Sequence, residues 1–334
     1  MSSRVAINGF GRIGRLVFRI GWGHPELEFV AINDITTPKM LAYLLKYDSV
    51  HGIWEHKVES TDNSIIVDGK EIPIYAIKSP EEIPWSKHNV DIVVESTGLF
   101  RKREQAAKHL AGGVKKVLIS APSPDADGTF VMGVNDDEYD PEIHQIITIG
   151  SCTTNGLVPL VKVLWDNFGI NRAIMTTIHS YTNDQRILDL PHKKDFRRAR
   201  AAGMSMIPTS TGAYKVAQAI YPELQGNFYA ISVRVPTPDA SMIDLNIDLK
   251  TETTAEEINR AFKAAADGTM AGIVEYCEDP VVSTDIIGNP HSTVFDALST
   301  TVVGNRGTFA KIISWYDNEF GFSNRMVDML LKMI

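Results

Sequence analysis

The chain has 334 residues, and its 33 lysines and arginines against 41 aspartates and glutamates give a formal net charge of −8. This length favours two domains of ordinary size, and the 44% of hydrophobic residues are enough for two cores. The acidic balance disfavours a nucleic-acid-binding protein, because binding to a phosphate backbone depends on clustered cations.

The sequence contains only two cysteines, Cys152 and Cys277. A disulfide framework is therefore excluded, and a reducing compartment is favoured. No run of about 18 apolar residues predicts a membrane span, and the first residues lack the pattern of a secretory signal. We therefore expect a cytoplasmic protein with no membrane or nucleic-acid partner.

Short apolar strands and helices alternate through the first half of the chain. The sequence predicts helices at Arg12–Trp22 and Lys102–Leu110, and strands at Val5–Phe10, Leu27–Ile32, Asp91–Glu95, Lys116–Ser120 and Gln145–Ile149. This alternation predicts a doubly wound parallel sheet. Asp68-Gly69 lies between two further strand-like segments, Ser64–Val67 and Lys70–Ile77, and favours a hairpin with a type I′ turn.

The second half changes to longer, β-rich segments. The pattern predicts strands at Arg172–Ile178, Phe228–Val235, Met242–Leu249 and Thr308–Ser314, and helices at Ser151–Asn167, Tyr214–Ile220, Glu256–Ala266 and Ser323–Ile334. Long strands with few helices between them indicate a mainly antiparallel sheet that is covered on one face. We interpret the methionines of the last helix as core packing.

The segment Gly9–Gly14 reads G-x-G-x-x-G, follows a strand and opens a helix. In this context Gly9 permits a tight turn, Gly11 lets the backbone approach a pyrophosphate, and Gly14 lets the helix pack close to the strand. The next strand ends at Asp34, where a carboxylate would accept hydrogen bonds from a ribose 2′-OH and repel a 2′-phosphate. The sequence thus predicts an NAD-binding domain of Rossmann type, while a plain turn or capping role for Asp34 stays open.

Cys152 lies in a polar segment between a strand and a helix. A thiol at a helix N-terminus has a lowered pKa, and its thiolate is a nucleophile. Cys277 has no such setting and is interpreted as a core residue. A nucleophilic cysteine needs a base. Of the 9 histidines we favour His179, which ends a strand among polar residues, and the other histidines stay open.

Five motifs resemble those of phosphorylating glyceraldehyde-3-phosphate dehydrogenases, in the same order and over the whole chain. They are Asn8–Arg15 (NGFGRIGR), Ser151–Asn155 (SCTTN), His179–Gln185 (HSYTNDQ), Arg234–Pro238 (RVPTP) and Trp315–Glu319 (WYDNE). The resemblance implies an NAD-binding domain over residues 1–150 and an α+β catalytic domain with a mainly antiparallel sheet over residues 151–316. It also implies that residues 317–334 pack back onto the first domain.

The reaction that this resemblance implies is the oxidation and phosphorylation of glyceraldehyde 3-phosphate to 1,3-bisphosphoglycerate, with reduction of NAD and no metal. Cys152 would attack the aldehyde to give a hemithioacetal, and His179 would take the proton. Hydride transfer would leave a thioester on Cys152, and inorganic phosphate would then release the acyl phosphate. Such covalent catalysis divides one difficult step into two easier ones.

Binding residues are carried over by the same likeness. The sugar phosphate is assigned to Thr182 and Arg234, with Asp184 nearby, and the attacking phosphate to Ser151, Thr153, Thr211, Gly212 and Arg198. The cofactor is assigned to Gly9, Gly11, Arg12, Ile13, Gly14, Asp34, Lys78, Thr97, Ser120 and Asn318. Taken without the family, Thr209 and Thr211 suit helix N-caps, Lys78 an exposed surface position and Ile13 a core position.

The loop from Ser180 to Arg200 carries six lysines and arginines, and it resembles the segment that packs between subunits in the homotetramers of this family. One departure is Gly156, which stands where many relatives have a second cysteine that the mechanism does not use. The alternative function is an erythrose-4-phosphate dehydrogenase on the same scaffold. The segment Tyr181–Asp184 and the aspartate at position 34 favour the glyceraldehyde enzyme.

Overall fold

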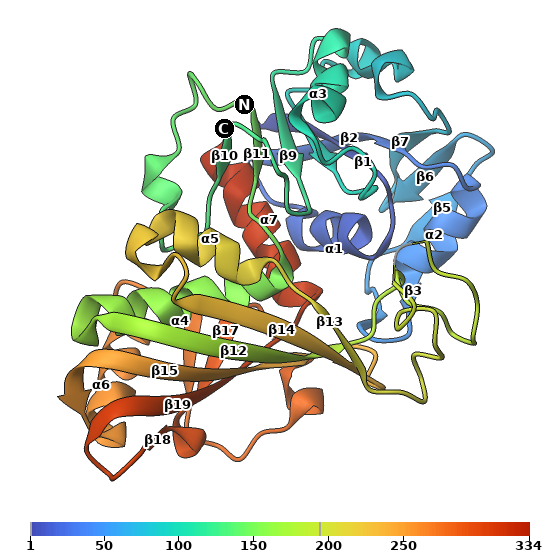
Figure 1. Ribbon diagram of the computed structural model, residues 1–334. Coiled ribbons are helices and arrows are strands. Elements are labelled where there is room, and N and C mark those ends of the chain that lie inside the picture. Colours follow the sequence, from blue (N-terminus) through green and yellow to red (C-terminus); the bar gives the residue numbers. More distant parts are fainter. Residues whose placement is uncertain (1, 194) are drawn as a thin grey trace. The chain divides into compact units, whose positions relative to one another are not determined.

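The computed structural model describes residues 2–193 and 195–334 (Figure 1). Lys194 of the basic loop therefore lies outside the described residues. The chain divides into two compact units. The first contains the residues up to Met132, Asp136–Ser151 and Ser323–Ile334, and the second contains Gly133–Asn135 and Cys152–Phe322.

A sheet of nine strands among the described residues forms the first unit, in the order β10-β11-β9-β8-β1-β2-β7-β6-β5. Its strands are β1 (Ser3–Asn8), β2 (Leu27–Asn33), β5 (Val58–Ser60), β6 (Ser64–Val67), β7 (Lys70–Tyr75), β8 (Ile92–Glu95), β9 (Lys116–Ile119), β10 (Gly128–Thr129) and β11 (Ile146–Thr148). The pairs from β10 through β7 are parallel, whereas β6 is antiparallel to both β7 and β5. The doubly wound parallel sheet expected from the alternating pattern is confirmed.

Helices of the first unit are α1 (Arg12–Gly21), α2 (Pro38–Lys46), α3 (Arg103–Ala106) and the greater part of α7 (Phe320–Lys332). Helix α1 buries Leu16, Val17 and Phe18, and the ring of Phe18 lies 4.9 Å from that of Phe29 on β2. This apolar contact fixes the helix over the sheet directly after the glycine turn, because buried aromatic pairs add specific packing to area burial. A short pair of strands, β3 (Tyr47–Asp48) and β4 (Gly52–Ile53), follows α2.

The Asp68-Gly69 hairpin has positive φ angles at both turn residues, 50° and 85°, as a type I′ turn requires. Two expectations need correction. The single helix expected over Lys102–Leu110 is the short α3 followed by a 3₁₀ helix at Ala107–Gly112. This tighter segment contains His109, whose buried ring bonds to Trp85 and Glu95. Helix α2 was not expected, although Thr37 caps it and Pro38 is its first residue.

The second unit is built on an eight-stranded sheet among the described residues, in the order β13-β14-β12-β15-β19-β17-β16, with β18 beside β19. Its strands are β12 (Ile170–Ser180), β13 (Ile207–Ser210), β14 (Phe228–Val235), β15 (Ser241–Thr253), β16 (Val274–Cys277), β17 (Thr293–Asp296), β18 (Thr301–Val302) and β19 (Gly307–Tyr316). Most pairs are antiparallel, but β12–β14 and β16–β17 are parallel. The expected mainly antiparallel sheet is thus confirmed.

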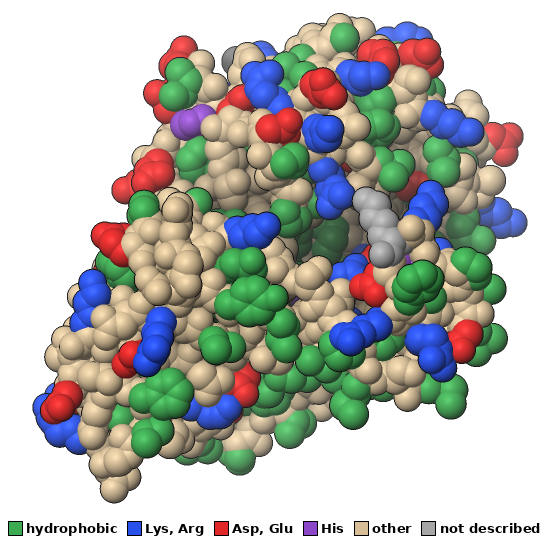
Figure 2. All heavy atoms as spheres, in the orientation of Figure 1, with side chains coloured by type: hydrophobic (Ala, Val, Ile, Leu, Met, Phe, Trp, Pro, Cys, Tyr) green, Lys and Arg blue, Asp and Glu red, His purple; other side chains and the backbone are tan. Residues whose placement is uncertain are grey.

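Three helices, α4 (Cys152–Phe168), α5 (Ala213–Ile220) and α6 (Ala255–Ala266), pack on this sheet. Residues of β15 alternate between buried and half-buried, and Ile243, Leu245 and Ile247 are fully buried. The other face keeps large apolar side chains exposed, including Ile174 and Tyr229, and Figure 2 shows hydrophobic side chains on the surface over these strands. The sheet is therefore covered on one face, as the alternating burial of its strands requires.

Candidate active site

The glycine turn between β1 and α1 is determined by close approaches of the backbone. Gly9 has a φ of 91°, and a Cβ atom there would lie 2.6 Å from the backbone nitrogen of Thr97. A Cβ atom on Gly14 would lie 2.2 Å from the carbonyl oxygen of Gly9. A Cβ atom on Gly11 would meet no described protein atom within 4 Å. Gly9 and Gly14 are therefore required by the fold, whereas Gly11 keeps space open at the start of the helix.

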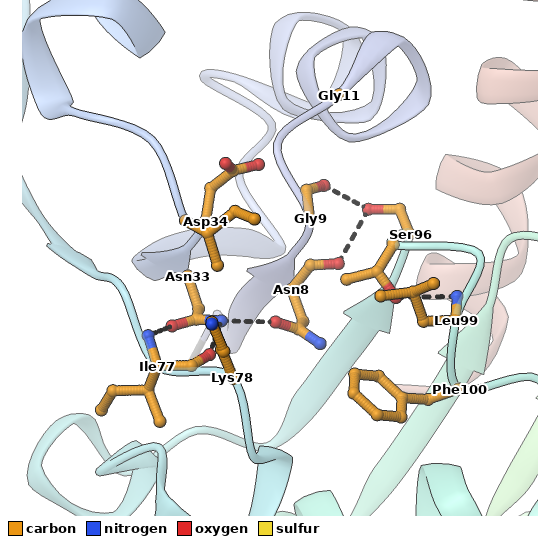
Figure 3. A pocket seen from close by; sticks show the side chains of 12 residues that line it. Asn8, Gly9, Gly11, Asn33, Asp34, Ile77, Lys78, Ser96, Leu99 and Phe100 are labelled. Atoms are coloured by element: carbon orange, nitrogen blue, oxygen red, sulfur yellow. Dashed lines mark hydrogen bonds between the residues drawn. The ribbon is translucent and has the colours of Figure 1, made fainter. Parts of the chain in front are cut away.

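A cavity of about 500 Å³ opens beside this turn (Figure 3). Gly9, Gly11, Asp34, Lys78 and Thr97, all expected at the cofactor, line it. Sequence reasoning missed further lining residues, which are Asn8, Asn33, Ile35, Ile77, Ser96, Leu99 and Phe100. Arg12, Ile13, Gly14 and Ser120 were also expected at the cofactor and are not among the lining residues.

The carboxylate of Asp34 is fixed by the turn that it faces. One oxygen accepts a hydrogen bond from the backbone N–H of Phe10 at 2.8 Å, and the other accepts one from Thr36 at 3.1 Å. The turn role that stayed open from the sequence therefore exists. Each carboxylate oxygen can accept a second bond, so the turn role and a bond to a ribose hydroxyl are compatible.

Arg12, the first residue of α1, donates a hydrogen bond to Asp48 at 2.5 Å. Burial alone would raise the pKa of Asp48, but hydrogen bonds from the backbone N–H groups of His51 and Val50 and from Arg12 bring it down to about 2. The ion pair places a guanidinium beside the N-terminus of α1, where backbone N–H groups already favour an anion.

These features fit a dinucleotide. The space above Gly11 suits a pyrophosphate, Arg12 adds a positive charge, and Asp34 offers acceptors to a ribose. Apolar walls at Ile35 and Leu99, which are 73% and 71% exposed, suit the flat faces of bases.

The reactive pair lies within the second unit. Cys152 is the first residue of α4, and its Sγ is 3.4 Å from Nε2 of His179 near the end of β12. Nδ1 of His179 lies 2.7 Å from the carbonyl oxygen of Ser180, which can only accept a hydrogen bond. The carbonyl is the nearer partner of Nδ1 and favours a proton there, whereas Nη1 of Arg234, 2.9 Å away, can only donate and favours an accepting Nδ1. With the proton on Nδ1, Nε2 faces the thiol as an acceptor. This is the tautomer that a general base requires.

Burial lowers the pKa of His179 to about 3, and the nearby charge of Arg234 acts in the same direction. Nη1 of Arg234 lies 2.9 Å from Nδ1 of His179 and donates to the same Ser180 carbonyl at 3.2 Å. The imidazole is therefore neutral at physiological pH, because its protonated form would lie buried beside a guanidinium.

Burial raises the pKa of the Cys152 thiol, whereas Arg234 and the hydroxyl and backbone N–H of Thr153 lower it. The sequence predicted a lowered pKa from the helix start alone, and the net direction in the cofactor-free chain is the opposite. The helix start acts as expected, but removal of the thiol from water outweighs it. Cys277 is buried in an apolar cluster with Ile286 and Val294 and bonds only weakly to Asp279, which agrees with its core interpretation.

Tyr316, which sequence reasoning missed, joins the two elements of the thiol site. Its hydroxyl lies 3.0 Å from that of Thr153 on α4 and 2.9 Å from that of Thr177 on β12. The ring of Tyr316 also meets His179 edge to face. The only sequence signal was its place in the Trp315–Glu319 motif.

Asn318 lies in the same unit, with Oδ1 accepting from the hydroxyls of Ser180 at 2.8 Å and Ser241 at 2.7 Å. These bonds orient the amide, so its N–H₂ group points to the opposite side.

The residues expected at the two phosphates form a partly connected set. Arg198 donates to Thr209 at 2.9 and 2.7 Å and forms an ion pair with Asp184. Thr182 and Thr211 are half-buried and Gly212 is exposed. Thr211 accepts from the N–H of Ala213 at 3.3 Å, as a capping threonine would, while Gly212 is the N-cap of α5. Ser151 directly precedes the thiol in the chain and belongs to the first unit.

A glycine-turn cavity for a dinucleotide and a half-buried thiol beside a buried imidazole define a nucleotide-dependent oxidoreductase with a cysteine nucleophile. Two family models identify the family to which the chain belongs. The NAD binding domain of glyceraldehyde 3-phosphate dehydrogenase matches residues 3–103, and its C-terminal domain matches residues 151–318. The chain belongs to the glyceraldehyde-3-phosphate dehydrogenase family, and its cofactor is NAD.

Relatives match over nearly the whole chain. Glyceraldehyde-3-phosphate dehydrogenase of Geobacillus stearothermophilus is 55% identical, over 98% of this chain and 97% of its own. Glyceraldehyde-3-phosphate dehydrogenase 1 of Bacillus subtilis (strain 168) is 55% identical over the same shares. The Thermotoga maritima enzyme of that name is 54% identical over 99% of this chain and 100% of its own. These matches give no support to the erythrose-4-phosphate alternative.

Among the described residues, no helix is long and apolar enough to cross a membrane.

The glycine turn yields a matched pair of variants. Gly14→Ala should destabilise the chain by about 3 kcal/mol, because its methyl group would overlap a backbone oxygen. Gly11→Ala should cost about 1 kcal/mol or less, yet raise the Kd of NAD about tenfold or more, because its methyl group occupies the space above the helix start. Urea unfolding and NAD titration check both. Equal effects of the two variants on stability would contradict this reading.

Asp48→Asn should lower stability at pH 7 by about 1–2 kcal/mol. The folded-state pKa of Asp48 is depressed, so its contribution is complete above the unfolded-state value and is lost as the pH falls through about 2. The gap between wild type and variant in urea unfolding should therefore be constant from pH 7 to about 5 and shrink below about 4. A gap that widens toward acid would contradict the assignment.

Arg234→Gln should raise the pKa of Cys152 further, because Arg234 lowers it in the wild type. Alkylation by iodoacetamide at pH 8 should slow by up to about tenfold, the effect of one pKa unit. In the cofactor-free wild type the rate should still be rising at pH 9. Cys277 is an internal reference, and Arg260→Gln, at an exposed position on α6, is the control. Unchanged or faster labelling of Cys152 would contradict the role of Arg234.

Proposed function

We propose that the chain oxidises glyceraldehyde 3-phosphate with NAD and inorganic phosphate to give 1,3-bisphosphoglycerate. One observation carries this proposal. The Sγ atom of Cys152 lies 3.4 Å from Nε2 of His179, in a chain that carries the NAD-binding domain of this family. The sulfur adds to the aldehyde carbon as the thiol proton passes to Nε2 of His179 and on to the developing hydroxyl, which gives a hemithioacetal.

NAD, when bound, accepts the hydride. As that hydride leaves the hemithioacetal carbon, Nε2 of His179 takes the hydroxyl proton, and a thioester remains on Cys152. Inorganic phosphate then attacks the thioester carbonyl, the C–S bond breaks, and His179 returns a proton to the sulfur. The aldehyde carbon is oxidised, and the acyl group ends on phosphate instead of on water.

We assign the substrate phosphate to Thr182 and Arg234. Burial is the main cause that lowers the pKa of Arg234, and the charged thiolate opposes it, so an anion bound there would stabilise the buried cation. Because Arg234 also lowers the pKa of His179, a phosphate dianion on Arg234 would restore basicity to the imidazole. Substrate binding would thus activate the base.

The attacking phosphate is assigned to the hydroxyls of Ser151, Thr153 and Thr211, the backbone of Gly212 and the guanidinium of Arg198. Support comes from Arg198, which its ion pair with Asp184 and its bonds to Thr209 hold at one edge of the sheet. Arg12, Ile13, Lys78, Thr97, Ser120 and Asn318 keep their assignment to NAD as part of this proposal. The proposal also keeps an NAD-binding domain at residues 1–150 and a catalytic domain at residues 151–316, with residues 317–334 packed on the NAD-binding domain.

We further propose a homotetramer in the cytoplasm. The loop after His179 exposes large apolar side chains to water, among them Ile187 at 88% and Phe196 at 94% exposed. The open sheet face adds Ile174 and Tyr229. Apolar surfaces of this kind mark protein interfaces, and second copies of the chain are the partners that the family suggests. A reducing cytoplasm suits a mechanism that needs a free thiol.

An absorbance assay at 340 nm tests the function. We expect NADH formation that requires both glyceraldehyde 3-phosphate and inorganic phosphate, that falls strongly when NADP replaces NAD, and that Cys152→Ser abolishes. Cys277→Ser is the matched control and should keep the activity. Oxidation that is independent of phosphate, or an equal rate with erythrose 4-phosphate, would contradict the proposal.

A further inference from the structure

A chain of buried polar side chains runs beneath the dinucleotide cavity of the first unit. Its centre is Glu95, the last residue of β8, whose side chain is 1% exposed. Asn8 and His109, which bond to it, are 1% and 0% exposed. Polar groups at such depth lower stability unless each is bonded, so a connected set in this place calls for an explanation beyond core packing.

All partners of Glu95 are donors. One oxygen accepts from the backbone N–H of Thr97 at 2.9 Å and from its hydroxyl. The other accepts from Nδ2 of Asn8 at 2.6 Å and from Nε2 of His109 at 3.0 Å. The hydroxyl of Thr97 is itself an acceptor for the N–H of Leu99 at 3.0 Å, which leaves its proton for Glu95. Four donors on two oxygens match the acceptor capacity of a carboxylate.

The tautomer of His109 follows from Trp85. An indole N–H can only donate, and that of Trp85 lies 3.1 Å from Nδ1 of His109. Nδ1 therefore accepts, and Nε2 carries the proton that is donated to Glu95. The imidazole is neutral, so the buried cluster keeps the single negative charge of the carboxylate.

The bonds continue from Asn8 to the other side of the cavity. Oδ1 of Asn8 accepts from Nδ2 of Asn33 at 2.8 Å. Asn33 holds both backbone groups of Ile77, accepting from its N–H at 2.9 Å and donating to its carbonyl at 2.9 Å. The Glu95 carboxylate fixes the donor-to-acceptor direction of this series of hydrogen bonds, because a flipped Asn8 amide would turn its oxygen toward Glu95.

Both ends of this chain are walls of the cavity. Leu99 lies on one side of it, Ile77 and Lys78 lie on the other, and Asn8 and Asn33 lie between them (Figure 3). Thr97, two residues before Leu99, also lines the cavity. We propose that Glu95 is a positioning residue that aligns these two walls with each other, so that a ligand spanning both, the NAD of the proposed function, meets them in register. A ligand that reaches only one wall gains less from this alignment.

Glu95→Gln tests this inference in the full chain. In either orientation of the new amide, its N–H₂ group faces one of the two donor pairs, which are the N–H and hydroxyl of Thr97 or the side chains of Asn8 and His109. One wall of the cavity therefore loses its hydrogen bonds to residue 95. We expect the Kd of NAD to rise about tenfold, the usual effect of a lost hydrogen bond to a charged group. The Kd of 5′-AMP, which has the ribose assigned to Asp34 but lacks the nicotinamide half of NAD, should rise by about threefold or less. Glu104→Gln, at an exposed position on α3, is the control and should change neither value.

Hydrogen exchange of the cofactor-free chain supplies a second readout. In Glu95→Gln, exchange should be faster than in the control in at least one of the segments 75–79 and 96–100. Faster exchange with an unchanged Kd of NAD would reduce Glu95 to a structural role and overturn the inference. So would a weakened Kd with unchanged exchange, or an equal loss for NAD and 5′-AMP. If the wild type itself binds no NAD, the proposed function fails, whereas this inference fails when the wild type binds NAD and the variant gives any of these three outcomes.

If Glu95→Gln does not fold, Asn8→Ser is the second variant. It removes the hydrogen bonds of the Asn8 amide to Glu95 and Asn33 and leaves Thr97 bonded to Glu95. Exchange in 75–79 should then rise while 96–100 stays as in wild type, and NAD should again weaken more than 5′-AMP. Unchanged exchange in 75–79 together with an unchanged Kd of NAD would overturn the inference.

Discussion

The hydrogen bond from Nδ1 of His179 to the Ser180 carbonyl is the interaction on which the chemistry of the second unit depends. It fixes which imidazole nitrogen faces the Cys152 sulfur, and the opposite tautomer would present a second donor to the thiol. Ser180 can make this bond because it follows His179 at the end of β12, while its hydroxyl and backbone N–H bond to Asn318 and Ser241. A backbone carbonyl can only accept and favours a proton on Nδ1, while the guanidinium of Arg234 can only donate and favours the other tautomer, so the proton position on His179 depends on both neighbours.

Burial then determines the charge of the pair. Removal from water raises the pKa of the thiol and lowers that of the imidazole, so both are neutral until something else changes. The positive charge of Arg234 acts on both the thiol and the imidazole and lowers the pKa of each. A phosphate that binds this guanidinium changes the balance at the base and the nucleophile together. In the proposed function, Arg234 would therefore couple recognition of the substrate phosphate to proton transfer.

Much of this arrangement could be predicted from the sequence, and the reasons differ by element. The G-x-G-x-x-G turn was readable because Gly9 and Gly14 are required by contacts with residues close in the fold. The strands β12, β14, β15 and β19 were readable because alternating burial leaves a period of two. Tyr316 was missed because its function comes from bonds to Thr153 and Thr177, which are distant in sequence. The pKa of Cys152 was predicted in the wrong direction, because a helix start is visible in sequence and burial is not.

The histidines show the same limit most clearly. The sequence set His179 apart by its place at a strand end among polar residues, but it carries no information on the tautomer of His179 or His109. The Trp85 indole can only donate, so Nε2 of His109 must donate to Glu95. The Ser180 carbonyl can only accept, and a proton on Nδ1 that binds it leaves Nε2 of His179 to accept from Cys152. In each case a neighbour with one hydrogen-bonding role decides what the imidazole does. The first is a donor that holds a carboxylate under the dinucleotide cavity, and the second is the base of the proposed function.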